Sequence, residues 1–247
     1  MSFLGTTAQY QAALRNWHGI QDAPDKTNRP RRFGMKVMNS YLLERFLTTA
    51  HWTLPGLWAI PLVTFLLYRS ILLEGRSPDS IVALFLAGVL GWTFAEYWLH
   101  RWVFHFAPSG NRAIRAIQFA LHGYHHEFPD DPNRLVAPPI LAVPIGIFLA
   151  AVVMVCFPAH WSPILAGVFS GYLCYDWMHY YCHHGRPHSR IGKFMRRFHL
   201  EHHYKNANSQ FGLSSPLWDV VFLTYRRPGQ PTPTERACLG KEANTGT

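Results

Sequence analysis

The sequence predicts an all-α integral membrane protein whose helices cross the bilayer four times. Three observations lead to this fold class: long runs without a charged residue, arginines and lysines gathered in alternate loops between these runs, and prolines that divide the longest run. A bilayer core is about 30 Å thick, so a helix of about 20 apolar residues crosses it. A soluble protein with buried core helices is the alternative, but uncharged runs of this length argue against it.

Each predicted span is a run of about 20 residues that is almost free of charge. The four spans cover residues 51–72, 81–100, 136–157 and 161–182. The last two belong to one uncharged stretch, residues 135–175, which is too long for a single helix. Pro158 and Pro163 lie within this stretch with polar residues between them, and they favour a turn that separates two spans.

The basic residues predict how the spans are oriented. Arg and Lys are dense before the first span, between the second and third, and after the fourth, whereas the turn after the first span carries only Arg76 and the turn at 157–162 carries none. Cytoplasmic loops of membrane proteins are enriched in Arg and Lys. We therefore expect both termini and the central loop to be cytoplasmic. The formal charge of +9 is explained by this face, so no nucleic-acid partner is expected.

The chain divides into three predicted parts. Residues 1–50 form a cytosolic N-terminal segment, in which residues 36–50 show the pattern of an amphipathic helix lying on the membrane surface. Residues 51–227 form the membrane domain, and residues 228–247, rich in Pro, Thr and Gly, form a disordered tail. Residues 1–30 show no signal peptide, and the four cysteines form no CxxC pair or disulfide framework.

The functional signal lies in the histidines, of which the chain has fifteen. They gather in four clusters: EYWLHRWVFH, HGYHHEFP, DWMHYYCHH and HLEHHY. Residues at i, i+3 and i+4 share one helix face, so each HxxHH cluster is expected to present its imidazoles to a common point, as are His179 and His183. His100 and His105 are five residues apart, about 140° around an ideal helix. They are expected to serve two different ions, or the helix unwinds between them.

All four clusters belong to the predicted cytoplasmic face, so their imidazoles are expected to converge. Ten imidazoles exceed what one first-row ion accepts, and we therefore predict a site for two metal ions. Imidazole suits Fe, Zn, Cu and Ni, and the pattern does not choose among them. The expected ligands are His100, His105, His122, His125, His126, His179, His183, His199, His202 and His203. The histidines expected to lie outside the ligand set are His18, His51, His160, His184 and His188.

Two carboxylates are expected to orient the ligand imidazoles by accepting a hydrogen bond from the ring nitrogen that does not bind the metal. Glu96 lies one turn before His100, and Asp176 lies three residues before His179. Each is within a predicted span, where an unpaired carboxylate is costly. Either could instead pair with a nearby arginine such as Arg101.

These motifs resemble those of the fatty acid hydroxylase superfamily, most closely its fatty acid 2-hydroxylase branch. The likeness covers about residues 40–225 and includes HGYHHEFPDDPNRLVAPP, HYYCHHGRPHS and HHYKNANSQFGLSSPLWDVVF, which are more specific than histidine boxes alone. It implies four spans, a cytosolic helical cap and a dimetal centre between them, with the same ten histidines as ligands. It also implies O2-dependent hydroxylation at carbon 2 of a fatty acid or of a sphingolipid acyl chain.

The resemblance further implies two iron ions, which zinc can replace in purified or crystallised protein, with O2 as co-substrate. No HPGG-type motif of a cytochrome b5 domain is present, so we expect a lipid substrate and a separate electron donor, cytochrome b5-like or ferredoxin-like. The membrane is a bacterial inner membrane or the endoplasmic reticulum. Alternatives are a desaturase or a sterol or carotenoid hydroxylase. Outside enzymes, a metal transporter or metal-binding protein would place polar ligands near the bilayer midplane rather than at span ends.

Overall fold

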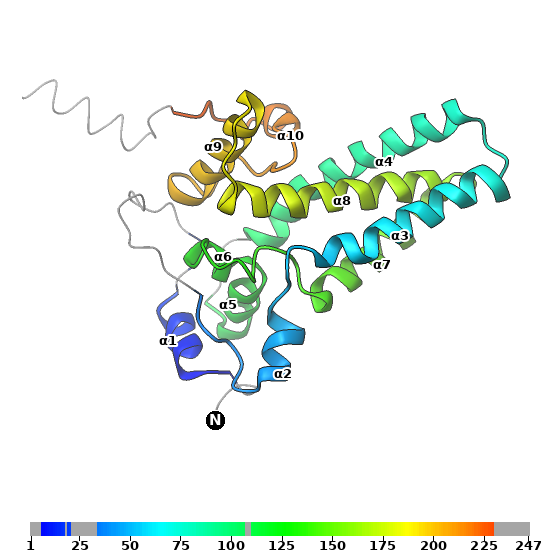
Figure 1. The fold of residues 1–247 in the computed structure, drawn as a ribbon. Coiled ribbons are helices and arrows are strands. Elements are labelled where there is room, and N and C mark those ends of the chain that lie inside the picture. Colours follow the sequence, from blue (N-terminus) through cyan, green and yellow to red (C-terminus); the bar gives the residue numbers. More distant parts are fainter. Residues whose placement is uncertain (1–5, 18, 21–33, 107–109, 230–247) are drawn as a thin grey trace, which may run out of the picture.

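The computed structural model describes residues 6–17, 19–20, 34–106 and 110–229, and most of the tail expected to be disordered, residues 230–247, lies outside them. Within the described residues the regular elements are helices, which confirms the all-α prediction. Four of the described α-helices form a rod, and the other six form a head at one end of it (Figure 1). The rod consists of α3 (Leu54–Tyr68), α4 (Pro78–Trp98), α7 (Pro139–Cys156) and α8 (Trp161–His184). The head consists of α1 (Ala8–Asn16), α2 (Tyr41–Leu43), α5 (Arg112–Gln118), α6 (Tyr124–Glu127), α9 (Arg190–Tyr204) and α10 (Leu217–Val221).

Four single π-helical turns extend or join these helices. Such turns carry i→i+5 hydrogen bonds and often occur at functional sites. They are η3 (Glu44–Thr48), η4 (Arg69–Leu73), η5 (Leu99–Phe104) and η6 (Phe119–Gly123).

Three of the predicted spans correspond to helices that are long and apolar enough to cross a membrane. They are Leu54–Leu73, Pro78–Phe104 and Pro139–Cys156. The fourth predicted span is α8, a helix of 24 residues, which is not among them because its polar and aromatic residues lower its mean hydropathy. The chain is a membrane protein with at least these three apolar helices in its described part.

Helix α8 lies at the centre of the rod and packs against α3 and α4. Its apolar half forms the core with Leu66 of α3, Trp92 of α4 and Val153 of α7, and buries Leu165 and Phe169 among them. The crossing with α4 is close because two glycines face each other: a Cβ atom on Gly88 would collide with the carbonyl oxygen of Ile164, and one on Gly167 with that of Phe85. Helix α7 has little of its surface buried, as expected for a helix surrounded by lipid.

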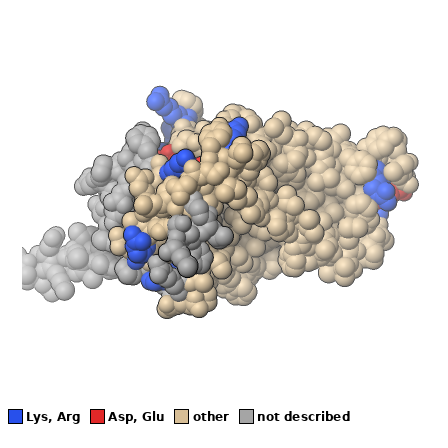
Figure 2. Space-filling model, turned by 90° about the horizontal axis from the view of Figure 1, so that it is seen from below, with Lys and Arg blue, Asp and Glu red and all other residues tan. Residues whose placement is uncertain are grey.

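Exposed charge gathers at the two ends of the molecule, whereas Glu96 and Asp176, within rod helices, are buried. Figure 2 shows Lys and Arg on the head and at the far tip of the rod, while the middle of the rod shows none on this face. At the turn that follows α3, Glu74 pairs with Arg69 at 3.2 Å and with Arg76 at 2.6 Å. The Glu74 carboxylate also accepts a hydrogen bond from Ser162 at the start of α8. These polar contacts join the end of α3 to the start of α8, where the apolar surface of the rod ends.

The amphipathic helix expected over residues 36–50 is shorter in the structure. Helical turns run only from 41 to 48, because Ser40 caps them and the backbone before it is extended. The extended part is held by the Glu44 carboxylate, which accepts hydrogen bonds from the backbone N–H groups of Val37 and Met38 at 3.0 and 2.6 Å. The short helix still exposes an apolar face, formed by Tyr41, Leu42, Leu43 and Phe46. Helix α1 was not expected from the sequence.

Candidate metal centre

The ten histidines expected as ligands come together where the rod meets the head. They form two groups of five, and within each group one nitrogen per imidazole lies within 4.8 Å of the others. The first group is His100, His105, His122, His126 and His202. The second group is His125, His179, His183, His199 and His203. Nine of these side chains are buried, and His105 is partly exposed.

Within each group it is the Nε2 atoms that converge. In the first group, the Nε2 of His122 lies 3.0 Å from that of His100 and 3.1 Å from that of His126. In the second, the Nε2 of His125 lies 2.8 Å from that of His179 and 3.0 Å from that of His203. Five nitrogens that point at one small volume, without an oxygen acceptor between them, are the arrangement of ligands around a cation.

The structure corrects the expectation that each HxxHH cluster serves one common point. His122 and His126 belong to the first group, but His125 belongs to the second. The cluster on α9 is also divided: His202 belongs to the first group, and His199 and His203 belong to the second. The reason is helical geometry: at 100° per residue, positions i and i+4 differ by about 40°, whereas i+3 and i+4 differ by about 100°. One cluster therefore supplies ligands to both groups.

The five-residue spacing of His100 and His105 is resolved by a π-helical turn. The backbone N–H of His105 donates to the carbonyl of His100 at 3.0 Å, an i→i+5 bond that closes η5. The wider turn brings both imidazoles to one side, with their ring centroids 4.8 Å apart. They belong to the same group, so the prediction that they serve two different ions is wrong, and the helix widens rather than unwinds.

Backbone carbonyls hold two first-group imidazoles in the orientation a ligand needs. The Nδ1 of His100 lies 2.6 Å from the carbonyl oxygen of Phe211, and the Nδ1 of His202 lies 2.7 Å from that of Ser209. A carbonyl can only accept, so each Nδ1 carries the proton and each Nε2 keeps its lone pair for a metal. Sequence reasoning missed these two residues, because a backbone carbonyl leaves no residue-type signature.

Glu96 has partners other than those expected. Its carboxylate is buried and accepts hydrogen bonds from the backbone N–H groups of Leu213 and Ser214 at 2.5 and 2.8 Å, and from the Ser214 hydroxyl. It touches no imidazole and does not pair with Arg101. It acts instead on the loop that carries the Phe211 carbonyl, so its effect on His100 is indirect.

Asp176 also differs from the expectation. Its carboxylate is fully buried in α8, and among the described residues it makes no hydrogen bond with an imidazole. The Nδ1 atoms of two second-group histidines, His125 and His203, are likewise buried without a hydrogen-bond partner in the described part of the chain. The two groups therefore differ: only the first is held by the loop at 209–211.

The donor set fits a pair of transition-metal ions. Six of the ten histidines belong to the head: His122, His125, His126, His199, His202 and His203. Burial, followed by the charge of neighbouring imidazoles, lowers the pKa of each of them well below the ordinary value of 6.5. These imidazoles are therefore neutral at physiological pH, which is the form that binds metal. All ten donors are nitrogens, which suit iron, zinc, copper and nickel. The described histidines outside both groups are His51, His160, His184 and His188, and His18 lies outside the described residues.

A cavity of about 550 Å³ reaches the histidines from the rod. His122 of the first group and His125 and His179 of the second lie on its wall. The remaining wall is mostly apolar and comes from two regions. In the rod it is formed by residues such as Trp58, Ile145, Leu149, Phe169 and Tyr172, and in the head by Thr6, Tyr10, Val37, Met38 and Leu47. The cavity therefore extends from the rod into the head, and the three histidines lie along its wall rather than at its end.

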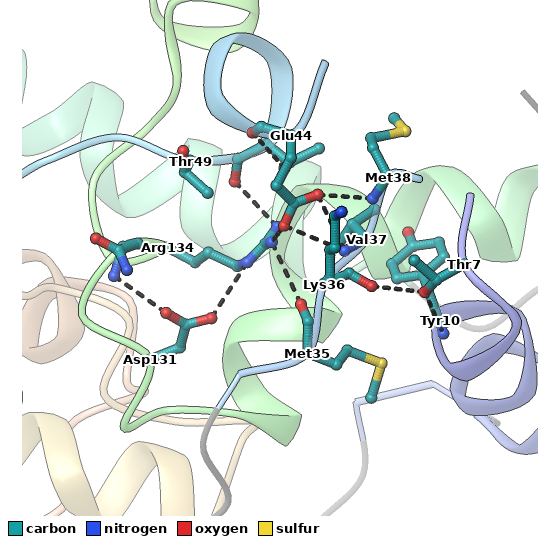
Figure 3. Close-up of polar contacts among 12 residues, drawn as sticks. Thr7, Tyr10, Met35, Lys36, Val37, Met38, Glu44, Thr49, Asp131 and Arg134 are labelled. Carbon is teal, nitrogen blue, oxygen red and sulfur yellow. Dashed lines mark hydrogen bonds and ion pairs between the residues drawn. The ribbon is translucent and has the colours of Figure 1, made fainter. Parts of the chain in front are cut away.

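Arg134, at the head end of this cavity, is the centre of a polar network (Figure 3). Its guanidinium pairs with Glu44 and, at 3.2 Å, with Asp131, and donates to the carbonyl oxygens of Thr48 at 3.0 Å and Met35 at 3.4 Å. Both ion pairs are mostly shielded from solvent, with 9–14% of each side chain exposed. The network ties the N-terminal segment to the loop that follows the first HxxHH cluster. The motif RLVAPP contains this arginine; Asp131 is three residues before it, whereas Glu44, Thr48 and Met35 are distant in the sequence.

Comparisons with known proteins agree with this geometry. Residues 85–224 match the model of the family described as fatty acid hydroxylase. The chain is 39% identical over 216 residues to the ceramide very long chain fatty acid hydroxylase SCS7 of Saccharomyces cerevisiae, covering 84% of this chain and 54% of that one. It is 37% identical over 195 residues to the dihydroceramide fatty acyl 2-hydroxylase FAH2 of Arabidopsis thaliana, covering 77% of this chain and 80% of that one.

The fatty acid 2-hydroxylase of Mus musculus is 34% identical over 210 residues, covering 77% of this chain and 56% of that one. The chain thus spans about half the length of the yeast and mouse relatives. A solved structure described as full-length scs7p, with only the hydroxylase domain visible, superposes with a TM-score of 0.73 at 35% identity, covering 80% of this chain and 75% of that one.

Proposed function

This chain belongs to the fatty acid hydroxylase family, and from that premise we propose that it is an O2-dependent monooxygenase. Its proposed reaction is hydroxylation of carbon 2 of a fatty acid or of the acyl chain of a ceramide-type sphingolipid. The observation that carries the proposal is the long apolar cavity whose wall includes His122, His125 and His179. Such a cavity fits an acyl chain and brings one carbon of it beside the histidines.

The proposed ligands are the ten histidines of the two groups, five to each ion, with iron in the working enzyme. When bound, the metal pair supplies O2 activation and one-electron chemistry, which redox-inert zinc lacks. In the balanced reaction, one O2, two electrons and two protons convert a C–H bond into C–OH and release one water. Zinc is proposed only as a substitute in purified protein.

The chain's own residues position the substrate. The apolar wall in the rod, which includes Leu149 and Phe169, binds the acyl tail and excludes water, because apolar surface is stabilised when it leaves water. The histidine wall lies between this tail region and the head end of the cavity. A carbon close to the polar end of the lipid then lies at the histidines, with the rest of the chain in the rod.

The head end of the cavity favours a neutral lipid. Arg134 lines it, but its positive charge is already paired with two carboxylates, Glu44 and Asp131. A free fatty-acid carboxylate would meet a network that already carries net negative charge, whereas an amide-linked acyl chain brings no charge. We therefore propose the acyl chain of a ceramide-type lipid before a free fatty acid.

The topology is part of the proposal. Helix α8 serves as the fourth span, because it packs between α3 and α4, and both of these are apolar enough to cross the membrane. The domain boundaries are proposed as residues 1–50, 51–227 and 228–247, with both termini and the histidines on the cytoplasmic side. The head then forms a cytosolic cap, and electrons come from a separate donor. The membrane is a bacterial inner membrane or the endoplasmic reticulum.

The test is lipid analysis by mass spectrometry of cells with and without the chain, together with metal analysis of the purified protein. We expect 2-hydroxyacyl lipids that carry one 18O atom when the cells grow under 18O2, and about two metal ions per chain. A cell expressing the His125→Ala variant is the control. A product with a double bond, or with oxygen on a sterol or carotenoid ring, would overturn the assignment to carbon 2.

A further inference from the structure

Helix α10 and the residues directly after it expose several apolar side chains. Leu217, Val220 and Val221 are 44%, 55% and 53% exposed, and Leu223 is 91% exposed. Exposed apolar patches of this kind mark contacts with another protein or with a membrane. The surroundings of α10 decide between these two.

Leu223 is also in a costly backbone conformation. Its φ is +58°, in the left-handed region that ends many helices and that usually carries glycine. A non-glycine residue there is strained, because its Cβ atom comes too close to the following carbonyl oxygen. The chain thus keeps a leucine where glycine would be less strained, with its side chain projecting from the protein. Strain combined with full exposure points to a role for this side chain outside the chain itself.

The position of α10 along α4 fixes its depth. The indole N–H of Trp218 donates to the Thr93 hydroxyl at 3.0 Å, and the Trp218 ring lies 4.9 Å from that of Phe94. Thr93 is fifteen residues after Pro78, where α4 begins, and at 1.5 Å per residue this is about 22 Å along the helix. The hydrocarbon core is about 30 Å thick. If α4 crosses the bilayer from its first turn, α10 lies at the depth of the acyl chains.

The lipid-facing surface of α4 continues onto α10. On α4, Leu90 and Phe94 are 49% and 41% exposed, and they lie beside the α10 contact. Just beyond, Trp98 packs on Phe222 with ring centroids 4.8 Å apart, and Trp is enriched where the hydrocarbon meets the head groups. The apolar face of α10 therefore continues the exposed apolar surface of α4, which faces lipid if α4 crosses the bilayer.

Backbone polar groups around Asp219 form hydrogen bonds within the protein, as a position inside the membrane requires. Polar backbone groups at membrane depth must be satisfied within the protein. The carbonyl of Asp219 accepts from the N–H groups of Thr224 and Tyr225 at 2.8 and 2.9 Å. Its buried carboxylate accepts from the N–H groups of Phe211 and Gly212 at 2.8 and 2.7 Å. The turn is thus closed by hydrogen bonds of its own.

We propose that residues 217–223 are inserted into the bilayer as a short apolar wedge, with lipid acyl chains around Val220, Val221 and Leu223. The wedge lies in the leaflet in which α4 ends, and the arginines at 226 and 227 follow it toward the head groups. It fastens the loop at 209–214, which holds His100 and His202, to the membrane surface. The proposal rests on α4 crossing the membrane and does not depend on the reaction catalysed.

The test is a nitroxide spin label at position 220 or 223 of the full chain in liposomes. Labels are attached to Val220→Cys and Leu223→Cys in a background in which Cys156, Cys174 and Cys238 are alanine and the buried Cys182 is kept. Collision with O2, which concentrates among acyl chains, is compared with collision with a nickel chelate, which stays in water. Leu86, 58% exposed in the middle of α4, provides the lipid control, and the exposed Lys193 on α9 provides the water control.

We expect both test positions to resemble position 86, with an O2-to-nickel collision ratio several-fold above that at position 193. A ratio like that at 193 would show that the segment lies in water and would overturn the proposal. Low collision with both reagents would show that a second copy or another protein covers it, which also overturns it. Because the readout is collision rather than turnover, the result is independent of the proposed hydroxylase activity.

Discussion

His100 and Phe211 are 111 residues apart in the chain, yet the imidazole Nδ1 of the first donates a hydrogen bond to the backbone carbonyl of the second at 2.6 Å. This bond turns the Nε2 of His100 toward the other first-group histidines. The Phe211 carbonyl is in turn held by a loop that Glu96, one helical turn before His100, fastens to α4. Ligand orientation at the first group therefore depends on a carboxylate that touches no ligand.

Replacing Glu96 with alanine is expected to weaken metal binding at the first group. The loop at 211–214 loses one of its two carboxylate anchors and keeps the other, Asp219. The carbonyl that orients His100 is then held less firmly, and changes of this kind cost about 10–100-fold in metal affinity. Metal titration of the purified protein measures it. Glu96→Gln keeps an accepting oxygen and should recover part of the affinity. Asp79→Asn, in the exposed first turn of α4 at the end remote from the histidines, is the control, and wild-type affinity in Glu96→Ala would contradict the prediction.

Removing one ligand from each group is expected to remove different ions. His202→Ala affects the first group and His125→Ala the second, so each should lower the metal content from about two ions per chain toward one, and the double variant toward none. Metal analysis by mass spectrometry measures the content. His160→Ala is the matched control, because that side chain contacts Arg76 at the far tip of the rod. Full occupancy in both single variants would show that these residues are not ligands.

A larger side chain in the rod part of the cavity is expected to shorten the acyl chain that fits. Ile145 lines the cavity, whereas Val143 on the same helix is 55% exposed and faces away. Ile145→Trp should shift the products toward shorter acyl chains, because an indole fills space that the tail would occupy. Val143→Trp should leave the chain-length distribution unchanged. The distribution in lipid extracts measures the effect, and equal shifts in both variants would argue against this cavity as the acyl site.

Replacing Arg134 with methionine is expected to destabilise the protein by about 3–5 kcal/mol, because it leaves two largely buried carboxylates, Glu44 and Asp131, without the positive charge that pairs with them. Thermal unfolding in detergent measures the loss. Arg197→Met is the control: Arg197 pairs with one carboxylate rather than two, 59% of its side chain is exposed, and Glu201 keeps a hydrogen bond from the N–H of Gly229 at 2.7 Å. Its loss should therefore cost less than about 1 kcal/mol. Similar unfolding temperatures for the two variants would contradict the role assigned to the network.

The crossing of α4 and α8 is expected to tolerate no side chain at Gly88. A Cβ there would collide with the backbone of Ile164, so Gly88→Ala should cost about 1–3 kcal/mol. Gly91, on the same helix, has nothing within 4 Å of an added Cβ. Gly91→Ala should be neutral or stabilising by up to about 1 kcal/mol, because glycine is unfavourable within a helix. Unfolding in detergent compares the two, and equal stability would show that the crossing is looser than described.

Much of the fold class could be predicted because it depends on local sequence. Uncharged runs and the prolines between them led to helices close to the observed α3, α4, α7 and α8. Expectations were less successful in the head, where helices are short and stabilised by distant partners. The helix expected over 36–50 is shortened because Glu44 holds Val37 and Met38 in an extended strand-like segment, and helix α1 depends on contacts with Val37 and Phe119.

The sequence by itself determined that the chain is helical, that it carries apolar helices of membrane-spanning length, and which ten histidines come together. Helix periodicity is a local property, and it places residues such as His179 and His183 on one face whatever surrounds them. Only the tertiary structure decided how the histidines divide into two groups, that η5 widens into a π turn, and that Phe211, Ser209 and Arg134 support the site. These features depend on contacts between segments up to 111 residues apart, many through backbone carbonyls, which every residue type carries alike.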